Sequence, residues 1–446
     1  MARLRHATNR CRQSRTALGR ATLSRIPERF KRQPLPSRFC NLERLFDTLE
    51  RRGLDGVVAY LRPNVFYLSG FAPPSNQSVH ETNGYAAVVI SRHAPDHPVM
   101  VVAEFDLAYF LSQPSWIEDV RPYATLLQPL DIPLGDTPLD RFIPLDKRTS
   151  EWANAARHRY ASSLHDGVRG ALGDLGLGRG TVGFDDLRLA QSIATEALSV
   201  RDAYGTLKYV RQVKTDAELD LLRTATQLNQ QAIERTIATW SRGTTWQDLV
   251  HTYHVTATAL GGFVRDPGAV VIANAPGADP ALYMTSGLED FVVEPGMHIT
   301  WDCHGTWAHY CWDGGKTWLV EDDLLGEART IAEGTTNGMS ALQQAMRPGA
   351  RLSQLQATTR QAMRTSGLTR ADDAFIFFHG LGLEHIDMEI TDSHQDWALE
   401  DGMVVSAHLL VPGDERHRSW LEEIFLVTAD GGQPFFTWDH SPLMST

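Results

Sequence analysis

Two aspartates stand eleven positions apart in the stretch WDCHGTWAHYCWD, residues 301–313. We expect a hairpin here, in which one strand carries Asp302 outward and the returning strand ends at Asp313. The two carboxylates can then converge on one cation, and hard divalent ions need such clustered oxygen ligands. The pair alone is a weak signal, because two aspartates in a hairpin are usually solvated.

Two later segments add candidate ligands. His379 follows the apolar run 375–378 and precedes the glycine-rich turn 380–382, where backbone and substrate can approach closely. The alternative is a core histidine bonded to a nearby carbonyl. Glu422 enters the apolar strand 421–428, where a buried carboxylate needs a cation or hydrogen-bond donors. The plain alternative is an exposed glutamate pair at a strand edge.

The chain of 446 residues is long enough for two domains. Residues 1–40 form a basic extension, with ten Arg and one Lys against one acid in the first 38 positions. We expect this extension to be disordered. An organelle transit peptide and an over-extended start codon are the alternatives. A secretory signal is excluded, because the extension lacks a continuous apolar segment. The first folded domain is placed at 41–206 and the second at 207–446.

Hydrophobic periodicity predicts the elements of both domains. In the first, a helix from Leu42, a turn at Arg62-Pro63-Asn64 and alternating strands indicate an α/β fold. Its strands are expected at 56–60, 85–91, 99–104 and 181–184. In the second, Thr215 and Glu218 form a capping box that starts a helix. Further strands are expected at 270–273, 298–301, 316–320, 403–408 and 423–428, and helices at 325–345 and 352–365.

Composition limits the partners. A net charge of −12 argues against nucleic acid, and no run of 18 apolar residues could form a membrane helix. Four cysteines without a C-x-x-C pair give no disulfide framework, so we expect a reducing cytoplasm. Cys303 and Cys311 match no zinc-finger spacing and are interpreted as packing thiols in a strand pair.

The ordered set Asp302, Asp313, His379-Gly380-Leu381-Gly382 and Glu422 resembles the ligand pattern of the pita-bread metallohydrolase family. That family includes methionine aminopeptidases, Xaa-Pro peptidases and creatinase. The segments 53–58, 64–71 and 209–223 also resemble the two-domain, creatinase-type branch of that family. The resemblance implies a creatinase-like α/β N-terminal domain followed by an α+β pita-bread catalytic domain.

By the same resemblance, Asp302, Asp313, His379 and Glu422 are metal ligands. The family's other glutamate is replaced by His408 after the segment 402–407. Imidazole can still bind Mn, Fe, Co or Zn, so His408 is retained as a ligand. The loss of one carboxylate favours one ion over two, with manganese as the first candidate.

Two substrate-handling features of the family's peptidases are altered as well. Residues 274–283 lack the histidine expected before the first aspartate, and His385 follows His379 by six positions instead of seven, without the family's Glu-x-Pro. The simplest interpretation is hydrolysis of a small-molecule C–N bond by metal-activated hydroxide. Glu422 would accept the proton, and His385, or His304 as the alternative, would protonate the leaving nitrogen.

Five aromatic residues around the first aspartate pair suggest a flat or cationic substrate, although burial statistics assign half of them or more to the core. They are Trp301, Trp307, Tyr310, Trp312 and Trp318. An aromatic aminohydrolase similar to 5-nitroanthranilate deaminase is therefore the first hypothesis. The alternatives are an Xaa-Pro dipeptidase or aminopeptidase, a dimethylsulfoniopropionate lyase and a non-catalytic pita-bread binding module. The lyase has a similar motif but carries Asp at the position of His385. We further expect a homo-oligomer, a dimer or larger, by analogy with creatinase-type proteins.

Overall fold

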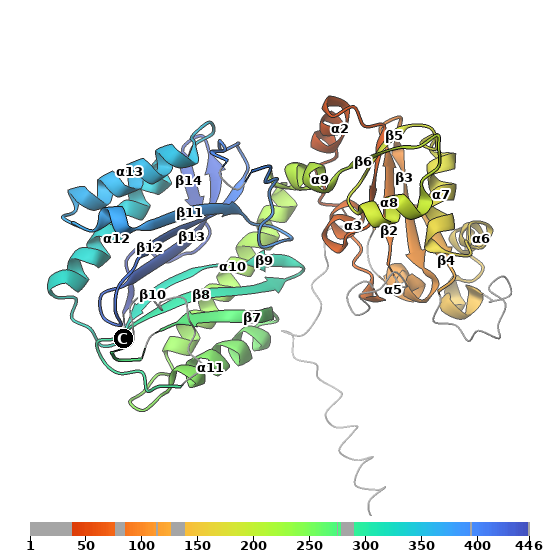
Figure 1. Ribbon diagram of the computed structural model, residues 1–446. Helices are drawn as coiled ribbons and strands as arrows, with labels where there is room; N and C mark the ends of the chain where they lie inside the picture. The colour runs from red at the N-terminus through yellow and green to blue at the C-terminus, as the bar shows by residue number, and fades with distance from the viewer. Residues whose placement is uncertain are drawn as a thin grey trace, which may run out of the picture.

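The computed structural model describes residues 38–75, 85–112, 115–125, 139–273, 275–277, 290–392 and 395–444, with the backbone alone at 265–272. The prediction of a disordered basic extension at 1–40 falls almost entirely outside these residues. None of the helices in the described ranges is both long and apolar enough to cross a membrane. Figure 1 shows two bodies side by side, joined by a short helical segment.

The first body is built on a six-stranded mixed sheet with the order β4-β3-β2-β1-β5-β6. The strands are β1 (Gly56–Ala59), β2 (Ala87–Ser91), β3 (Ala94–Ala103), β4 (Asp119–Tyr123), β5 (Thr181–Phe184) and β6 (Ser199–Asp202). Successive β1 residues point to opposite faces, so Val57 belongs to one hydrophobic cluster and Val58 to another. Both faces are therefore buried, and the predicted α/β fold is confirmed.

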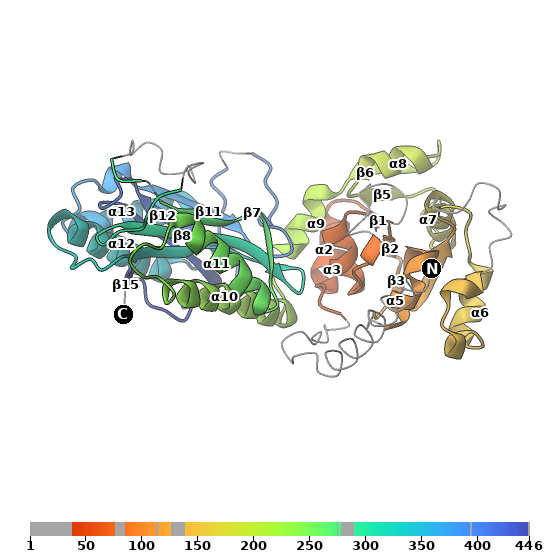
Figure 2. The ribbon, with the colours of Figure 1, turned by 90° about the horizontal axis from the view of Figure 1, so that it is seen from below.

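Helices cover the two faces of this sheet (Figures 1 and 2). They are α2 (Leu42–Arg51), α3 (Arg62–Ser69), α5 (Leu107–Ser112), α6 (Glu151–His158), α7 (Leu164–Asp174) and α8 (Leu187–Ile193). The predicted turn at Arg62-Pro63-Asn64 is wrong, because these residues begin α3. Proline is tolerated in the first turn of a helix, where its missing N–H has no intrahelical partner in any case.

The joint between the bodies consists of α9 (Tyr204–Arg211) and the start of α10 (Asp216–Ile237). The predicted capping box is present: the Glu218 amide donates to the Thr215 hydroxyl, and the Thr215 amide donates to the Glu218 carboxylate. These two bonds satisfy backbone donors that the first helical turn leaves open.

The second body is a nine-stranded sheet with the main order β11-β12-β13-β10-β8-β7. Its strands are β7 (Phe263–Ile272), β8 (His298–Trp307), β9 (Tyr310–Trp312), β10 (Gly315–Leu319), β11 (Phe375–Gly380), β12 (Val404–Val411), β13 (Ser419–Thr428), β14 (Gly431–Pro434) and β15 (Leu443–Met444). Helices α10 and α11 (Trp246–Ala259) pack on β7–β9, whereas α12 (Gly326–Ala345) packs on β12–β14 and α13 (Leu352–Thr365) on α12 and β11 (Figure 1). The predicted α+β fold is confirmed.

The hairpin expected around the aspartate pair is present as β8 and β9. Its turn is made by Ala308 and His309, both with positive φ (49° and 73°). Gly305 is required opposite Trp312, because a Cβ there would lie 2.0 Å from the indole Cζ2. The packing is therefore tight enough to fix how β9 delivers Asp313.

Candidate metal centre

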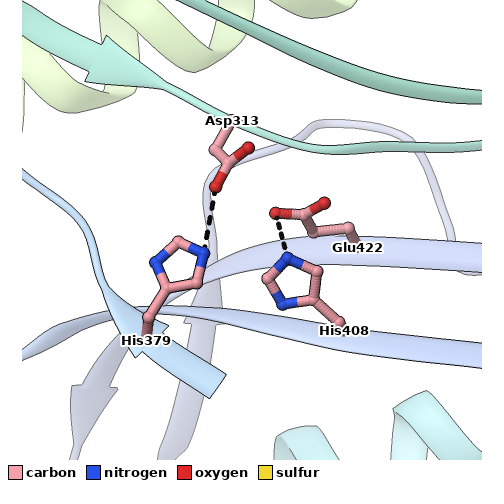
Figure 3. Close-up of side chains that lie close together, drawn as sticks. All are labelled: Asp313, His379, His408 and Glu422. Carbon is pink, nitrogen blue, oxygen red and sulfur yellow. Dashed lines mark ion pairs between the residues drawn. The ribbon is translucent and has the colours of Figure 1, made fainter. Parts of the chain in front are cut away.

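Five strands or strand ends bring the centre together. Asp302 lies within β8, Asp313 follows β9, and His379, His408 and Glu422 lie on β11, β12 and β13. His408 and Glu422 are direct cross-strand partners, so they share one face of the sheet. Figure 3 shows Asp313 approaching His379 while Glu422 lies beside His408.

Four of these residues form one compact group, with a ligand atom from each within 4.8 Å of the others: Asp313, His379, His408 and Glu422. His379 Nε2 lies 3.3 Å from Asp313 Oδ2, and His408 Nε2 lies 2.9 Å from Glu422 Oε1. All four residues are buried, with Asp313 and Glu422 fully inaccessible. Buried carboxylates and imidazoles that converge in this way form a set of donors suited to a divalent transition metal.

Four buried atoms in this group have no hydrogen-bond partner: Asp313 Oδ2, His379 Nε2, His408 Nδ1 and Glu422 Oε2. A buried polar atom without a partner costs roughly 1–3 kcal/mol, and more when the group is charged. A cation held by these four residues would supply a partner for their ligand atoms. The residues present therefore fit a bound metal ion.

The charge state of the group supports the same conclusion. Burial, and then the charge of Asp313, raises the pKa of Glu422 to about 8. Burial and the neighbouring His379 lower the pKa of His408 to about 3. Without a cation the group therefore holds protonated carboxylate and neutral imidazole, whereas a divalent ion would stabilise the ionised carboxylates.

The remaining predicted site residues surround Asp313 without joining that group. His304 Nε2 lies 2.9 Å from Asp302 Oδ1 and 3.1 Å from Asp313 Oδ1. His385 Nδ1 lies 3.5 Å from Asp313 Oδ2. Asp302 lies outside the four-residue group and is linked to it through His304, so its role as a direct metal ligand stays a prediction.

Comparison with protein families matches both bodies. Residues 41–213 match the creatinase/prolidase N-terminal domain, and residues 220–429 match metallopeptidase family M24. We refer to the second domain, most of which this family model matches, as the M24 domain. The M24 match spans the whole cluster of ligand candidates, from Asp302 to Glu422, so the expected pita-bread fold of this domain is confirmed.

Relatives of the M24 domain are distant in sequence. A curated relative, an uncharacterized peptidase of Staphylococcus aureus strain MSSA476, is 25% identical over 228 residues, which are 51% of this chain and 63% of the relative. The chain thus matches less than two thirds of that relative's length.

Solved structures share the two-domain fold. The prolidase of Pyrococcus horikoshii OT3 has a TM-score of 0.62 at 14% identity, covering 88% of this chain and 97% of that one. The Xaa-Pro dipeptidase of Bacillus anthracis has a TM-score of 0.62 at 18% identity, covering 90% and 98%. Dipeptidase PepE of Mycobacterium ulcerans has a TM-score of 0.63 at 21% identity, covering 91% and 96%.

The aromatic residues near the M24 centre do not form the substrate pocket suggested by the sequence. Trp301, Tyr310, Trp312 and Trp318 are completely buried and belong to the hydrophobic clusters beneath the sheet. Trp307 alone of the five is partly exposed. Side chains at alternating strand positions point to opposite faces of the sheet, and the sequence did not indicate which face the aromatic rings occupy. In the structure these four rings lie in the core.

A cleft of about 720 Å³ lies between the creatinase-type domain and the M24 domain. The first domain contributes residues that include Arg62 and Tyr85, and the second contributes Thr306, His309 and Glu384. Thr306 follows Asp302 by four positions on β8, so both project from the same face of the strand. Glu384 of the cleft lining directly precedes His385, whereas none of the candidate metal ligands lines the cleft itself.

Sequence reasoning missed two supporting features of the M24 centre. Ser406 donates a 2.6 Å hydrogen bond to Glu422 Oε1, the oxygen that also lies 2.9 Å from His408 Nε2. Arg211 in the joint donates 2.7 Å and 2.9 Å hydrogen bonds to Asp387 Oδ1, two residues after His385. Ser406 could have been noticed because it precedes His408 by two positions on the same strand. The Arg211 contact spans 176 positions, and no local pattern indicates it.

Proposed function

We propose that this protein is a metal-dependent hydrolase that cleaves an amide C–N bond in a small peptide-like substrate, with Xaa-Pro dipeptides as the first candidates. The single observation that carries the proposal is the convergence of four buried side chains, with one ligand atom from each within 4.8 Å of the others: Asp313, His379, His408 and Glu422. The M24 match and the prolidase fold favour a peptidase over the other hydrolases suggested by the sequence.

Bound at this point, a divalent ion would supply Lewis acidity, lowering the pKa of water and polarising a carbonyl group. Asp313, His379, His408 and Glu422 would hold it. Glu422 would accept the proton of the attacking water and return it to the leaving nitrogen, while Ser406 holds its Oε1. The imidazoles of His304 and His385 face Asp313, so we do not assign them this proton transfer.

The cleft suggests how the rest of a dipeptide would be held. Arg62 is exposed at its wall and makes no ion pair within the described part of the chain, so it can bind a substrate carboxylate. Apolar surface from Phe66 and Leu383 would accommodate a non-polar side chain or a proline ring. This is the substrate chemistry of a dipeptide with a free C-terminus.

An aromatic aminohydrolase is the second candidate. It was favoured by the aromatic residues, and that support is lost because four of the five are core residues. What still favours it is the altered substrate machinery, namely His408 in place of a glutamate and no histidine in 274–283. The lyase hypothesis is weaker, since an imidazole stands at 385 where that chemistry uses a carboxylate. A binding module would need no cation at the centre.

The test is hydrolysis by protein loaded separately with Mn²⁺, Co²⁺ and Zn²⁺. We expect proline release from Xaa-Pro dipeptides, and a loss of about 100-fold or more in Glu422→Gln. Arg62→Leu should raise KM and leave kcat nearly unchanged, because the contact is to substrate in both ground and transition states. His251→Ala, at an exposed position on α11, is the control and should match the wild type.

Two outcomes would reject the peptidase proposal. One is ammonia release from aromatic amines with no dipeptide cleavage, which would establish the aminohydrolase. The other is the absence of stoichiometric metal in protein purified without chelator and then saturated with each ion. That second result would indicate a binding module that retains the fold alone.

A further inference from the structure

An aromatic ring packs against the imidazole that stands where the family carries a glutamate. Phe377 on β11 is the direct cross-strand partner of His408 on β12. Its ring stacks on the imidazole, with the centroids 4.0 Å apart and the planes 18° from parallel. Stacked rings attract each other in addition to the apolar area that they bury. The plane of the His408 ring is therefore set from the neighbouring strand.

Trp420 packs against the same imidazole from a second direction. It lies on β13 two positions before Glu422, so both side chains point to the same face of the sheet. Its ring centroid lies 5.8 Å from that of His408 at 89°, and 6.3 Å from that of Phe377 at 73°. Trp420 is 3% exposed, whereas Phe377 is 42% exposed. His408 thus packs against two rings, one buried and perpendicular, the other half-exposed and nearly parallel.

These rings matter because no outer hydrogen bond orients His408. A ligating histidine usually donates its second ring N–H to an acceptor, and this bond fixes the tautomer and the ring orientation. His379 fits that rule, with Nδ1 3.2 Å from the Gly380 carbonyl. His408 Nε2 faces Glu422 Oε1 at 2.9 Å (Figure 3), and Nδ1 is buried with no hydrogen-bond partner in the described part of the chain. Burial lowers the pKa of His408, and the nearby Phe377 backbone opposes that shift without completing a hydrogen bond to Nδ1.

We propose that Phe377 is a positioning residue of the metal centre: its ring, in place of an outer hydrogen bond, holds the His408 imidazole with Nε2 toward Glu422. A carboxylate offers two oxygens with several lone pairs, whereas a neutral imidazole offers one acceptor nitrogen whose direction depends on the ring orientation. The stack thus supplies what an imidazole needs at a position where the family carries a glutamate. The inference rests on the proposed function only in taking the four-residue group as the ion site.

The experiment measures metal binding by the full chain after treatment with chelator, and it needs no substrate. Zn²⁺ is titrated by calorimetry, and Co²⁺ binding is followed by visible absorption. Phe377→Leu keeps an apolar side chain and removes the ring. We expect its Zn²⁺ affinity to fall by about 10-fold or more, as when a ligating histidine loses its outer partner, and its Co²⁺ spectrum to change. Phe377→Tyr restores a stacking ring and should bind Zn²⁺ within about 3-fold of the wild type.

Phe375→Leu is the matched control. Phe375 lies on the same face of β11, is 50% exposed and is paired with Leu410 instead of His408. We expect this variant to keep the wild-type Zn²⁺ affinity and Co²⁺ spectrum. Without metal, both leucine variants should unfold at similar urea concentrations, because both replaced side chains are half-exposed. Weaker Zn²⁺ binding in Phe377→Leu alone would then report on the orientation of His408.

Wild-type Zn²⁺ affinity and an unchanged Co²⁺ spectrum in Phe377→Leu would overturn the inference. An equal loss of affinity in Phe375→Leu, or no recovery in Phe377→Tyr, would overturn it as well. If Phe377→Leu does not fold, Phe377→Met takes its place with the same expectation. Weakened binding in Phe377→Leu by a protein that hydrolyses nothing would reject the proposed function and leave this inference standing. A wild type that takes up no ion would reject both.

Discussion

The joint between the domains offers the most quantitative test of how the centre is held. Arg211 has no exposed side-chain surface, and Asp387, its partner, is 1% exposed. Burial raises the pKa of Asp387, but the charges of Arg211 and Lys214 outweigh it and hold that pKa below its usual value. Arg211→Met removes the stronger partner and leaves a buried carboxylate with Lys214, 4.0 Å away, as its remaining charged partner and the Leu383 amide as a hydrogen-bond donor.

Breaking a buried ion pair by removing one partner costs about 3–5 kcal/mol, because the remaining charge is uncompensated. We expect the free energy of unfolding of the second domain to fall by that amount in Arg211→Met. Asp387→Leu added to it should restore part of the loss, so that the double variant is more stable than the sum of the single effects predicts. Arg329→Met is the control: its 2.8 Å pair with Glu333 lies on the exposed face of α12, and we expect no measurable change.

The assay is urea unfolding followed by tryptophan fluorescence, since buried Trp301, Trp312 and Trp318 report on the second domain. The pH dependence gives a second signature. A depressed pKa contributes stability that is present above the unfolded value and disappears as pH falls through the folded one. The contribution of the Arg211–Asp387 pair should therefore persist from neutral pH down to the ordinary aspartate pKa of 3.8 and shrink as the pH falls below it. An Arg211→Met protein as stable as Arg329→Met at pH 7 would refute the reasoning.

Three further outcomes follow from the centre. Asp313→Asn should bind no divalent ion, by metal analysis. The metal-free variant should unfold at the same or a higher urea concentration, since a buried carboxylate with a raised pKa costs stability. Metal affinity measured by calorimetry should rise as pH goes from 6 to 8 and then level off. The reason is that binding must displace the proton of Glu422, whose pKa is raised to about 8. A metal affinity that does not depend on pH would contradict this. Gly314→Ala should weaken metal binding and destabilise the fold. Gly314 has φ +82°, and a Cβ there would lie 2.8 Å from Glu422 Cγ. An unchanged metal affinity would show that the Glu422 side chain can move aside.

The local parts of this protein could be predicted from its sequence. The capping box at Thr215 and Glu218, the hairpin from Asp302 to Asp313 and the buried strand that carries Glu422 depend on residues a few positions apart. Periodicity and capping chemistry express themselves within one element. The order of the ligand candidates along the chain was sufficient to identify the pita-bread domain. Pro63 was misread for the same local reason, since proline suits a turn and a first helical turn equally.

Only the tertiary structure decided how these residues meet. The cross-strand pairing of His408 with Glu422 depends on the register of β12 and β13, in which a slip of one residue would turn His408 to the other face. The burial of the tryptophans and the approach of His304 and His385 to Asp313 are decided in the same way. Each depends on contacts between residues far apart in the chain, whose energies come from packing and desolvation in the folded state. A sequence pattern records which side chains are available, whereas the fold determines which of them share a low-dielectric site.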